Sequence, residues 1–224
     1  MRALAAVLAA FSLQCAATPF GLQVGDVRLG FDLPAGFTDS LPTGSPRILD
    51  LAESLTPATN RILVFALSDA DMRRFNSGDA PELKQYILAA TPKSLEYERM
   101  SGEAFNRYLS DGRSAMGKPV EGDITKTLEG RPPGQLTLLA ELLREPDAMA
   151  VIRGLRLPPA ESGGLFSSAK PSQFVLSSTS VILLRGKPLT LTLTSGYEGK
   201  ADLEWLRATT LRWIEELRRL NVSR

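Results

Sequence analysis

One short pattern in the chain has the residue types of a nucleophilic active site. Ser167 and Lys170 have the S-x-x-K spacing, in which one turn of helix lets a lysine activate a serine. Pro171 follows that lysine directly, and a residue before proline is disfavoured in helical backbone. The faint companion motifs, Ser110-Asp111-Gly112 and Lys126-Thr127-Leu128, precede the serine when they should follow it. We therefore interpret the pattern as chance and keep a small hydrolase, using carboxylates or a Ser-Lys pair, as an alternative.

A second pattern approaches a phosphate-binding loop. The stretch from Gly112 to Lys118 has the glycine and lysine spacing of such a loop, but Pro119 stands where a Ser or Thr should bind Mg²⁺. The first glycine also follows an expected helix, whereas a phosphate-binding loop follows a strand and opens a helix. The sequence therefore predicts no nucleotide site.

Acidic residues occur in pairs, but none of the pairs has the pattern of a metal or acid–base site. Asp69 and Asp71 begin like a calcium loop, yet Arg73 occupies the third ligand position and the turn glycine is absent. With Ser68 they fit a helix N-terminus better. Because acidic side chains are rarely buried, we expect three further pairs on solvated surfaces: Glu96 with Glu98, Glu141 with Glu145, and Glu215 with Glu216.

The residue types that are missing exclude more chemistry than these motifs suggest. The chain has no His, which excludes Ser-His-Asp triads, His-ligated metals and imidazole acid–base catalysis. The single Cys, Cys15, lies in a segment that we expect to be removed, so disulfides and thiol catalysis are excluded as well. The sequence predicts no catalytic, cofactor-binding or metal-binding residue.

The first 17 residues have the composition of an export signal. Arg2 precedes an uncharged apolar run of 11 residues from Ala3 to Leu13, and small residues at Cys15 and Ala17 predict cleavage between Ala17 and Thr18. A run of this length makes a helix of about 16 Å, too short to span a hydrocarbon core of about 30 Å. Acylation of Cys15 is the rival interpretation, but Gln14 stands where a lipoprotein signal normally has a small residue. We expect a periplasmic or secreted protein of bacterial type.

The mature chain, residues 18–224, is expected to form one domain that binds no nucleic acid. Removing residues 1–17 takes away one basic and no acidic residue, which leaves 25 of each and no long-range field for a polyanion. No later apolar run reaches the length of a transmembrane helix. No linker, charge block or repeat divides the chain.

The first half of the mature chain alternates between expected strands and helices. We predict strands at Asp26–Leu33, Arg61–Leu67 and Lys84–Ala90 from their apolar patterns. A short helix is expected from Ser68 to Phe75 and a longer one from Ser101 to about Ala115. The segments 34–46 and 117–134 are expected to be surface loops.

The second half is expected to form two hairpins and a closing helix. The first pairs Gln135–Leu143 with Ala148–Leu157, and the second pairs Phe174–Leu184 with Leu189–Thr194, separated by a small-residue loop at Ser162–Pro171. Lys200–Leu220 should be an amphipathic helix on the sheet. Its apolar stripe consists of Leu203, Leu206, Thr210, Trp213, Leu217 and Leu220, and we expect Trp205 and Trp213 to pack in the core.

Three of these features together resemble the Mog1/PsbP-like group, which includes bacterial periplasmic proteins related to DcrB. The opening strand leads into Leu33-Pro34-Ala35-Gly36-Phe37, the closing hairpin turns at Gly186-Lys187, and a long amphipathic helix ends the chain. The resemblance implies an α+β fold in which helices cover an antiparallel sheet, an α/β/α sandwich. It also implies an accessory or partner-binding role, and no functional residue carries over.

The sequence therefore predicts an exported, non-catalytic binding or accessory protein that acts through an envelope protein. A carrier of a small apolar ligand is a further alternative to the hydrolase. Because long loops often carry function, segments 34–46 and 116–134 are the expected binding surface.

Overall fold

The structure is a computed structural model that describes residues 18–158 and 173–222. The predicted export signal, the loop at Ser162–Pro171 and the Ser167–Lys170 motif lie outside these residues. The main sheet has seven antiparallel strands in the order β3-β4-β5-β9-β8-β7-β6. These strands are β3 (Phe37–Asp39), β4 (Asn60–Ser68), β5 (Gln85–Pro92), β6 (Thr137–Glu145), β7 (Ala148–Arg156), β8 (Phe174–Leu184) and β9 (Lys187–Tyr197).

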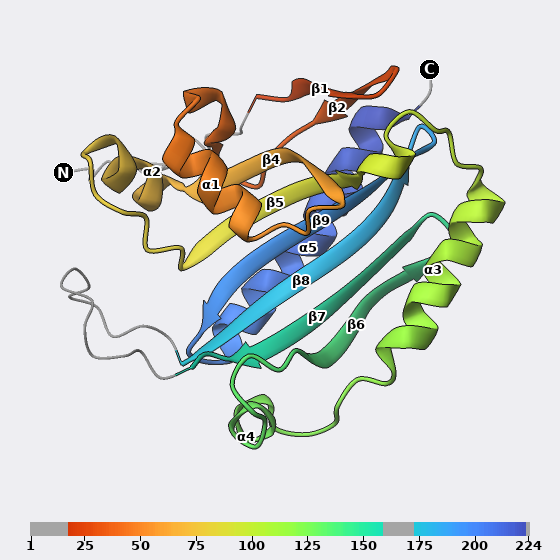
Figure 1. Ribbon diagram of the computed structural model, residues 1–224. Helices are drawn as coiled ribbons and strands as arrows, with labels where there is room; N and C mark the ends of the chain where they lie inside the picture. The colour runs from red at the N-terminus through yellow and green to blue at the C-terminus, as the bar shows by residue number, and fades with distance from the viewer. Residues whose placement is uncertain (1–17, 159–172, 223–224) are drawn as a thin grey trace, which may run out of the picture.

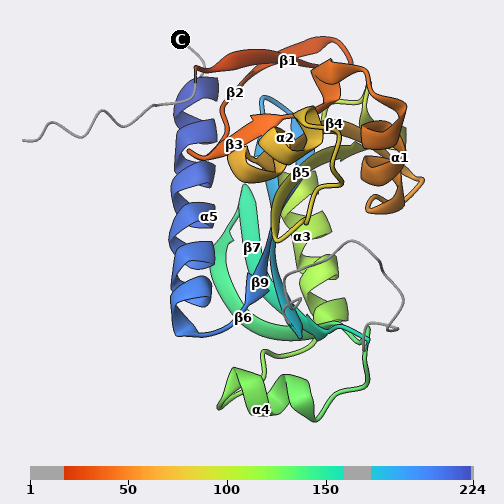
Figure 2. The same cartoon turned by 90° about the vertical axis from the view of Figure 1, so that its left-hand side faces the viewer.

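Helices cover both faces of this sheet, as predicted for an α/β/α sandwich (Figure 2). Helix α5 (Lys200–Asn221) lies on one face, and α1 (Pro46–Ser54), α2 (Asp69–Asn76) and α3 (Gly102–Met116) lie on the other (Figure 1). The short helix α4 (Ile124–Glu129) lies near one end of the sheet, and the hairpin of β1 (Phe20–Val24) and β2 (Val27–Phe31) lies at the opposite end. Two single turns of 3-10 helix, η1 (Leu41–Thr43) and η2 (Lys93–Leu95), complete the elements.

The predicted closing hairpin is confirmed. Strands β8 and β9 pair over their whole length and are joined by Arg185 and Gly186, whose φ angles of 50° and 82° are those of a tight hairpin turn. The leucines of β9 face the core under α5, whereas Thr190 and Thr192 are half-buried on the opposite face. The alternation of leucine and threonine therefore marks the two faces of the sheet.

Helix α5 buries the predicted stripe. Leu206, Trp213 and Leu217 are buried in the main core, and the Trp213 indole Nε1 donates a 2.8 Å hydrogen bond to the carbonyl oxygen of Asp32. Trp205 is partly buried and stacks on Phe37. Both tryptophans thus take the packing role expected of them.

Several expected boundaries were wrong. The opening strand is only β2, and β1 pairs with it in a separate two-stranded sheet outside the main one. The predicted loop at 34–46 contains β3 and η1, and the predicted loop at 117–134 contains α4, which buries Leu128. These elements have three to six residues, too short for a hydrophobic period to mark them. Among the described residues, no helix has the length and apolar character needed to cross a membrane.

Candidate functional site at the free edge of β4

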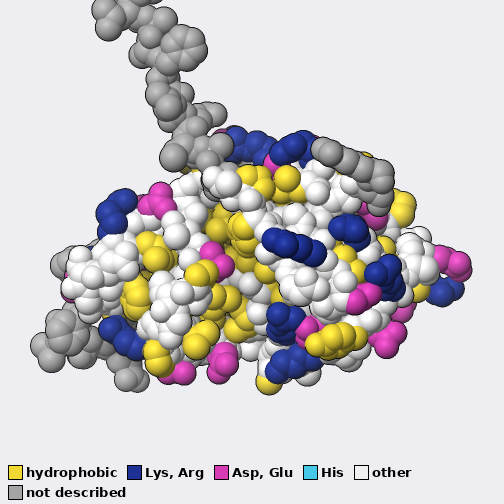
Figure 3. Space-filling model, turned by 90° about the horizontal axis from the view of Figure 1, so that it is seen from above, with side chains coloured by type: hydrophobic (Ala, Val, Ile, Leu, Met, Phe, Trp, Pro, Cys, Tyr) yellow, Lys and Arg dark blue, Asp and Glu magenta, His cyan; other side chains and the backbone are white. Residues whose placement is uncertain are grey.

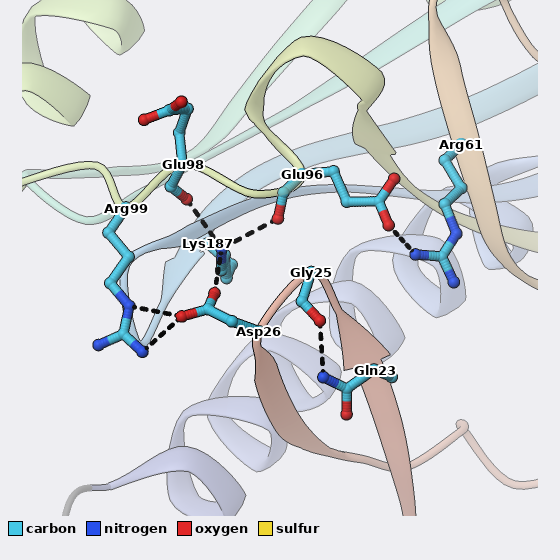
Figure 4. Close-up of polar contacts among 8 residues, drawn as sticks. All are labelled: Gln23, Gly25, Asp26, Arg61, Glu96, Glu98, Arg99 and Lys187. Carbon is cyan, nitrogen blue, oxygen red and sulfur yellow. Dashed lines mark hydrogen bonds and ion pairs between the residues drawn. The ribbon is translucent and has the colours of Figure 1, made fainter.

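A fully buried lysine lies where three chain segments meet at one end of the sheet. Lys187, the first residue of β9, has no solvent-exposed side-chain surface. Its ammonium group donates to the carbonyl oxygens of Glu96 and Glu98, both at 2.9 Å, and pairs with the carboxylate of Asp26 at 2.8 Å (Figure 4). An ammonium group has three hydrogens, so all of its donors are occupied.

The carboxylate of Asp26 lies in the turn of the β1–β2 hairpin and has two cationic partners. Besides Lys187, Arg99 donates to Asp26 Oδ2 from both Nε and Nη2, at 3.2 and 2.9 Å. Hydrogen bonds from Lys187 and then Arg99 lower the pKa of Asp26 from 3.8 to about 2. The carboxylate is therefore ionised under all ordinary conditions.

This cluster fastens the β1–β2 hairpin to the main sheet. Gly25, before Asp26, has φ of +54°, and a Cβ there would lie 2.1 Å from the carbonyl oxygen of Glu96. Only glycine can make this approach. An ammonium group that donates all three of its hydrogens has no lone pair with which to accept a proton or attack a carbonyl. We name Asp26, Glu96, Glu98, Arg99 and Lys187 the hairpin clamp.

The hairpin clamp borders a pocket of about 570 Å³, which we name the edge pocket. Arg61 connects the two, because it lines the pocket and its guanidinium Nη1 pairs with Glu96 of the clamp. The other lining residues come from η1, α1, the α1–β4 loop and the starts of β4 and η2: Leu41, Leu49, Glu53, Thr56, Pro57, Ala58, Asn60, Ile62 and Lys93. Figure 3 shows the molecule from above, with hydrophobic side chains gathered in a hollow and basic and acidic ones around it.

The pocket exists because β3 is short. Strand β4 pairs with β5 from Asn60 to Leu67 but with β3 only from Ala66 to Ser68. At Phe65, the residue of β4 just before this pairing begins, the N–H donates to the side chain of Asp39, and the carbonyl oxygen accepts from the N–H and hydroxyl of Ser40. These bonds end the pairing between β3 and β4. Proline at position 42 then turns the chain into η1. Within the part of the chain that the structure describes, the outer edge of β4 from 60 to 64 has no strand partner.

The two cationic side chains that line the pocket differ in whether a carboxylate is paired with them. Lys93 Nζ donates to the carbonyl oxygen of Ala58 at 2.8 Å but has no carboxylate within 4.0 Å among the described residues. Arg61 is paired with Glu96 through one nitrogen only. The pocket thus combines an apolar wall that includes Leu49, a strand edge and a cationic end.

The motifs singled out in the sequence lie away from this pocket. Gly112 is inside helix α3 and Gly117 ends it, so the phosphate-loop interpretation is excluded. Ser68 caps α2 by accepting from the Asp71 N–H, which confirms the helix-cap interpretation of Asp69 and Asp71. The expected surface segment 34–46 contributes Leu41 to the pocket, whereas 116–134 contributes no lining residue.

The carboxylate pairs do not gather into one site, and one of them differs from expectation. The Glu96 side chain is only 12% exposed, because it pairs with Arg61 beside the buried lysine. Sequence reasoning missed both Lys187 and the pocket. The available signals were a lysine that opens an apolar strand and an arginine within the apolar run of β4, and neither is specific.

The fold is an α+β sandwich with a seven-stranded antiparallel sheet and a long closing helix. No protein-family model matches the chain, and no curated protein matches it significantly. Among solved structures, the chain is similar to the Ran-binding protein Mog1p of Saccharomyces cerevisiae, with a TM-score of 0.37 and 12% sequence identity. The match covers 92% of this chain and 94% of that one. It transfers no functional residue to this chain.

Proposed function

We propose that the chain is an exported, non-catalytic binding protein that acts through a protein partner in the cell envelope. The edge pocket is its binding site. The observation that carries the proposal is the combination, in one open pocket, of a solvent-exposed apolar wall at Leu49 and an unpaired strand edge on β4. Exposed apolar surface with a polar rim is typical of interaction sites.

Two further observations favour binding over catalysis. The most deeply buried ionisable group near the pocket, Lys187, is fully engaged in holding the hairpin. Within residues 18–158 and 173–222, no group of three or more Cys, Asp or Glu could hold a metal ion. A hydrolase would need a free nucleophile and base facing a cleft. The pocket-lining residues include no serine or cysteine, and the Thr56 hydroxyl and the Lys93 ammonium group already donate to the carbonyl oxygens of Ala52 and Ala58.

The test is site-specific photocrosslinking in cells that make the protein naturally. A photoreactive amino acid replaces Leu49 in the pocket, and the matched control replaces Leu136, which is similarly exposed (43% and 53%) but lies beside β6. We expect position 49 alone to give an adduct with one envelope protein. Absence of an adduct at 49, or the same adducts from both positions, would refute the proposal.

A carrier of a small apolar ligand is the second candidate. A volume of about 570 Å³ lies within the ordinary range of small-molecule sites, and Leu41, Leu49 and Ile62 supply apolar surface. Native mass spectrometry of protein purified from its own host distinguishes the two. A bound small molecule that disappears in Leu49→Glu would favour the carrier.

A further inference from the structure

We infer that the edge pocket binds an extended peptide segment, which adds to the main sheet as a short strand along the outer edge of β4. This inference rests on the proposed function and specifies how the partner is recognised. The segment carries an aliphatic side chain for the apolar wall and an acidic side chain for the cationic end.

The free backbone edge supplies the first argument. The part of β4 that lines the pocket, from 60 to 62, has no strand partner on its outer side among the described residues. The N–H of Asn60 donates to the carbonyl oxygen of Pro57, and the next two residues, Leu63 and Val64, are buried where the pairing with β5 shifts register. Strand β3 pairs with β4 only beyond this stretch, so an added segment would occupy the position into which β3 would extend if it were longer. Unpaired N–H and carbonyl groups on a strand edge form a template for another strand.

The pocket wall supplies the second argument. Successive side chains of a strand point to opposite sides, so an added segment presents every other side chain to the same wall. That wall includes Leu41 from η1, Leu49 from α1 and Ile62 from β4. Leu49 is 43% exposed, and an aliphatic side chain between these residues would cover it.

The third argument comes from charge. The N–H of Lys93 donates to the carbonyl oxygen of Thr59 at 2.9 Å, which places Lys93 beside the start of β4. Its ammonium group has no carboxylate partner among the described residues, and Arg61 lines the same pocket. Glu53 of α1 lines the same wall and would repel an acidic side chain of the bound segment placed next to it. The acidic side chain of the segment is therefore expected at the Lys93 end of the pocket.

The direct test uses a synthetic peptide, acetyl-Thr-Leu-Thr-Asp-Thr-amide, labelled with a fluorophore and titrated with the mature protein. Its leucine and aspartate are two residues apart, so both face the same side of a strand. We expect saturable binding by fluorescence anisotropy, and at least tenfold weaker binding when lysine replaces the aspartate. Methylation of alternate backbone nitrogens should abolish binding for one set and leave it unchanged for the other, because only one set faces β4.

Protein variants locate the site. Leu49→Glu should weaken peptide binding at least tenfold, whereas Leu136→Glu, at a similarly exposed leucine, should leave it unchanged. Lys93→Gln should weaken binding several-fold and reduce its salt dependence, and Lys200→Gln serves as its control on the exposed surface of α5. Hydrogen exchange should show added protection, when the peptide is bound, at those β4 amides in the pocket-lining stretch that face away from β5.

The outcomes separate this inference from the proposed function. Strand addition is overturned if the peptide does not bind saturably, or if binding is unchanged whichever set of backbone nitrogens is methylated. In either case, a crosslinked partner specific to position 49 would still support the proposed function. Concentration-dependent dimerisation that Leu49→Glu abolishes would assign the pocket to a second copy of the chain and also overturn the inference. Peptide binding lost in Leu49→Glu but not in Leu136→Glu, with β4 protected, supports it.

Discussion

Lys187 Nζ lies 2.8 Å from Asp26 Oδ1, and this contact joins the turns of two hairpins that belong to different sheets. Asp26 is half-exposed in the β1–β2 turn, whereas Lys187 is fully buried at the start of β9. The same ammonium group bonds two backbone carbonyls after η2. Lys187 therefore connects the β1–β2 hairpin both to β9 and to the segment after η2.

Replacing that cation should destabilise the protein severely. Lys187→Met keeps much of the aliphatic stem but leaves the carbonyls of Glu96 and Glu98 without their buried donor. Because an unsatisfied buried polar group is costly, we expect the free energy of unfolding to fall by about 3 kcal/mol. Lys200→Met, at an exposed lysine, should change it by less than about 0.5 kcal/mol. Urea unfolding measures both, and equal effects would contradict the role of Lys187.

The Asp26 carboxylate should make part of the stability depend on acid pH. Its pKa is about 2 in the folded protein against 3.8 ordinarily, so its contribution is fully present above about pH 4 and is lost as the pH falls toward 2. Asp26→Asn should therefore lower the urea midpoint at pH 7 more than at pH 2.5. A difference between the two proteins that is the same at both pH values would exclude this linkage.

Gly25 and Gly36 form a matched pair that separates backbone strain from steric clash. Both have positive φ, +54° and +88°, but a Cβ at Gly36 would meet nothing within 4 Å, whereas one at Gly25 would meet the Glu96 carbonyl oxygen. Gly36→Ala should cost about 1 kcal/mol from strain alone. Gly25→Ala should cost at least about 2 kcal/mol more, because the hairpin must move away from η2. Equal losses on urea unfolding would show that the turn does not pack against η2 as described.

The sequence predicted the elements in which a regular apolar spacing repeats over many residues. Strands β8 and β9 and helix α5 each have 11 or more residues, and their apolar spacing identifies the buried face without reference to any other element. The edge pocket has no such signal, because it depends on where β3 stops. That boundary is set by Asp39 and Ser40 bonding to Phe65, 25 or more residues away in the chain.

Lys187 illustrates the same limit for polar residues. A lysine next to a hairpin glycine is ordinarily solvated, and its burial follows from acceptors on the segment after η2 and in the β1–β2 turn. The partners are distant in sequence, so no local pattern identifies them. The resemblance to the Mog1/PsbP-like group agreed with the fold but did not include this cluster.

A last prediction concerns the hydroxyl pair between α5 and the sheet. Ser178 Oγ and Thr210 Oγ1 are 2.5 Å apart and buried, and Thr210 Oγ1 also donates to the carbonyl oxygen of Leu206 at 2.7 Å. The single hydrogen of the threonine hydroxyl is used in that bond, so Ser178 must be the donor in the pair. Thr210→Val then leaves the Ser178 hydroxyl buried without its acceptor, whereas Ser178→Ala leaves Thr210 still donating to Leu206.

We therefore expect Thr210→Val to cost about 2 kcal/mol and Ser178→Ala about 1 kcal/mol in the free energy of unfolding. The double variant should cost less than the sum by about 1 kcal/mol, because removing both partners leaves no stranded hydroxyl. Urea unfolding of the wild type, both single variants and the double variant completes the cycle. Strict additivity, or a larger loss from Ser178→Ala than from Thr210→Val, would mean that the donor assignment is wrong.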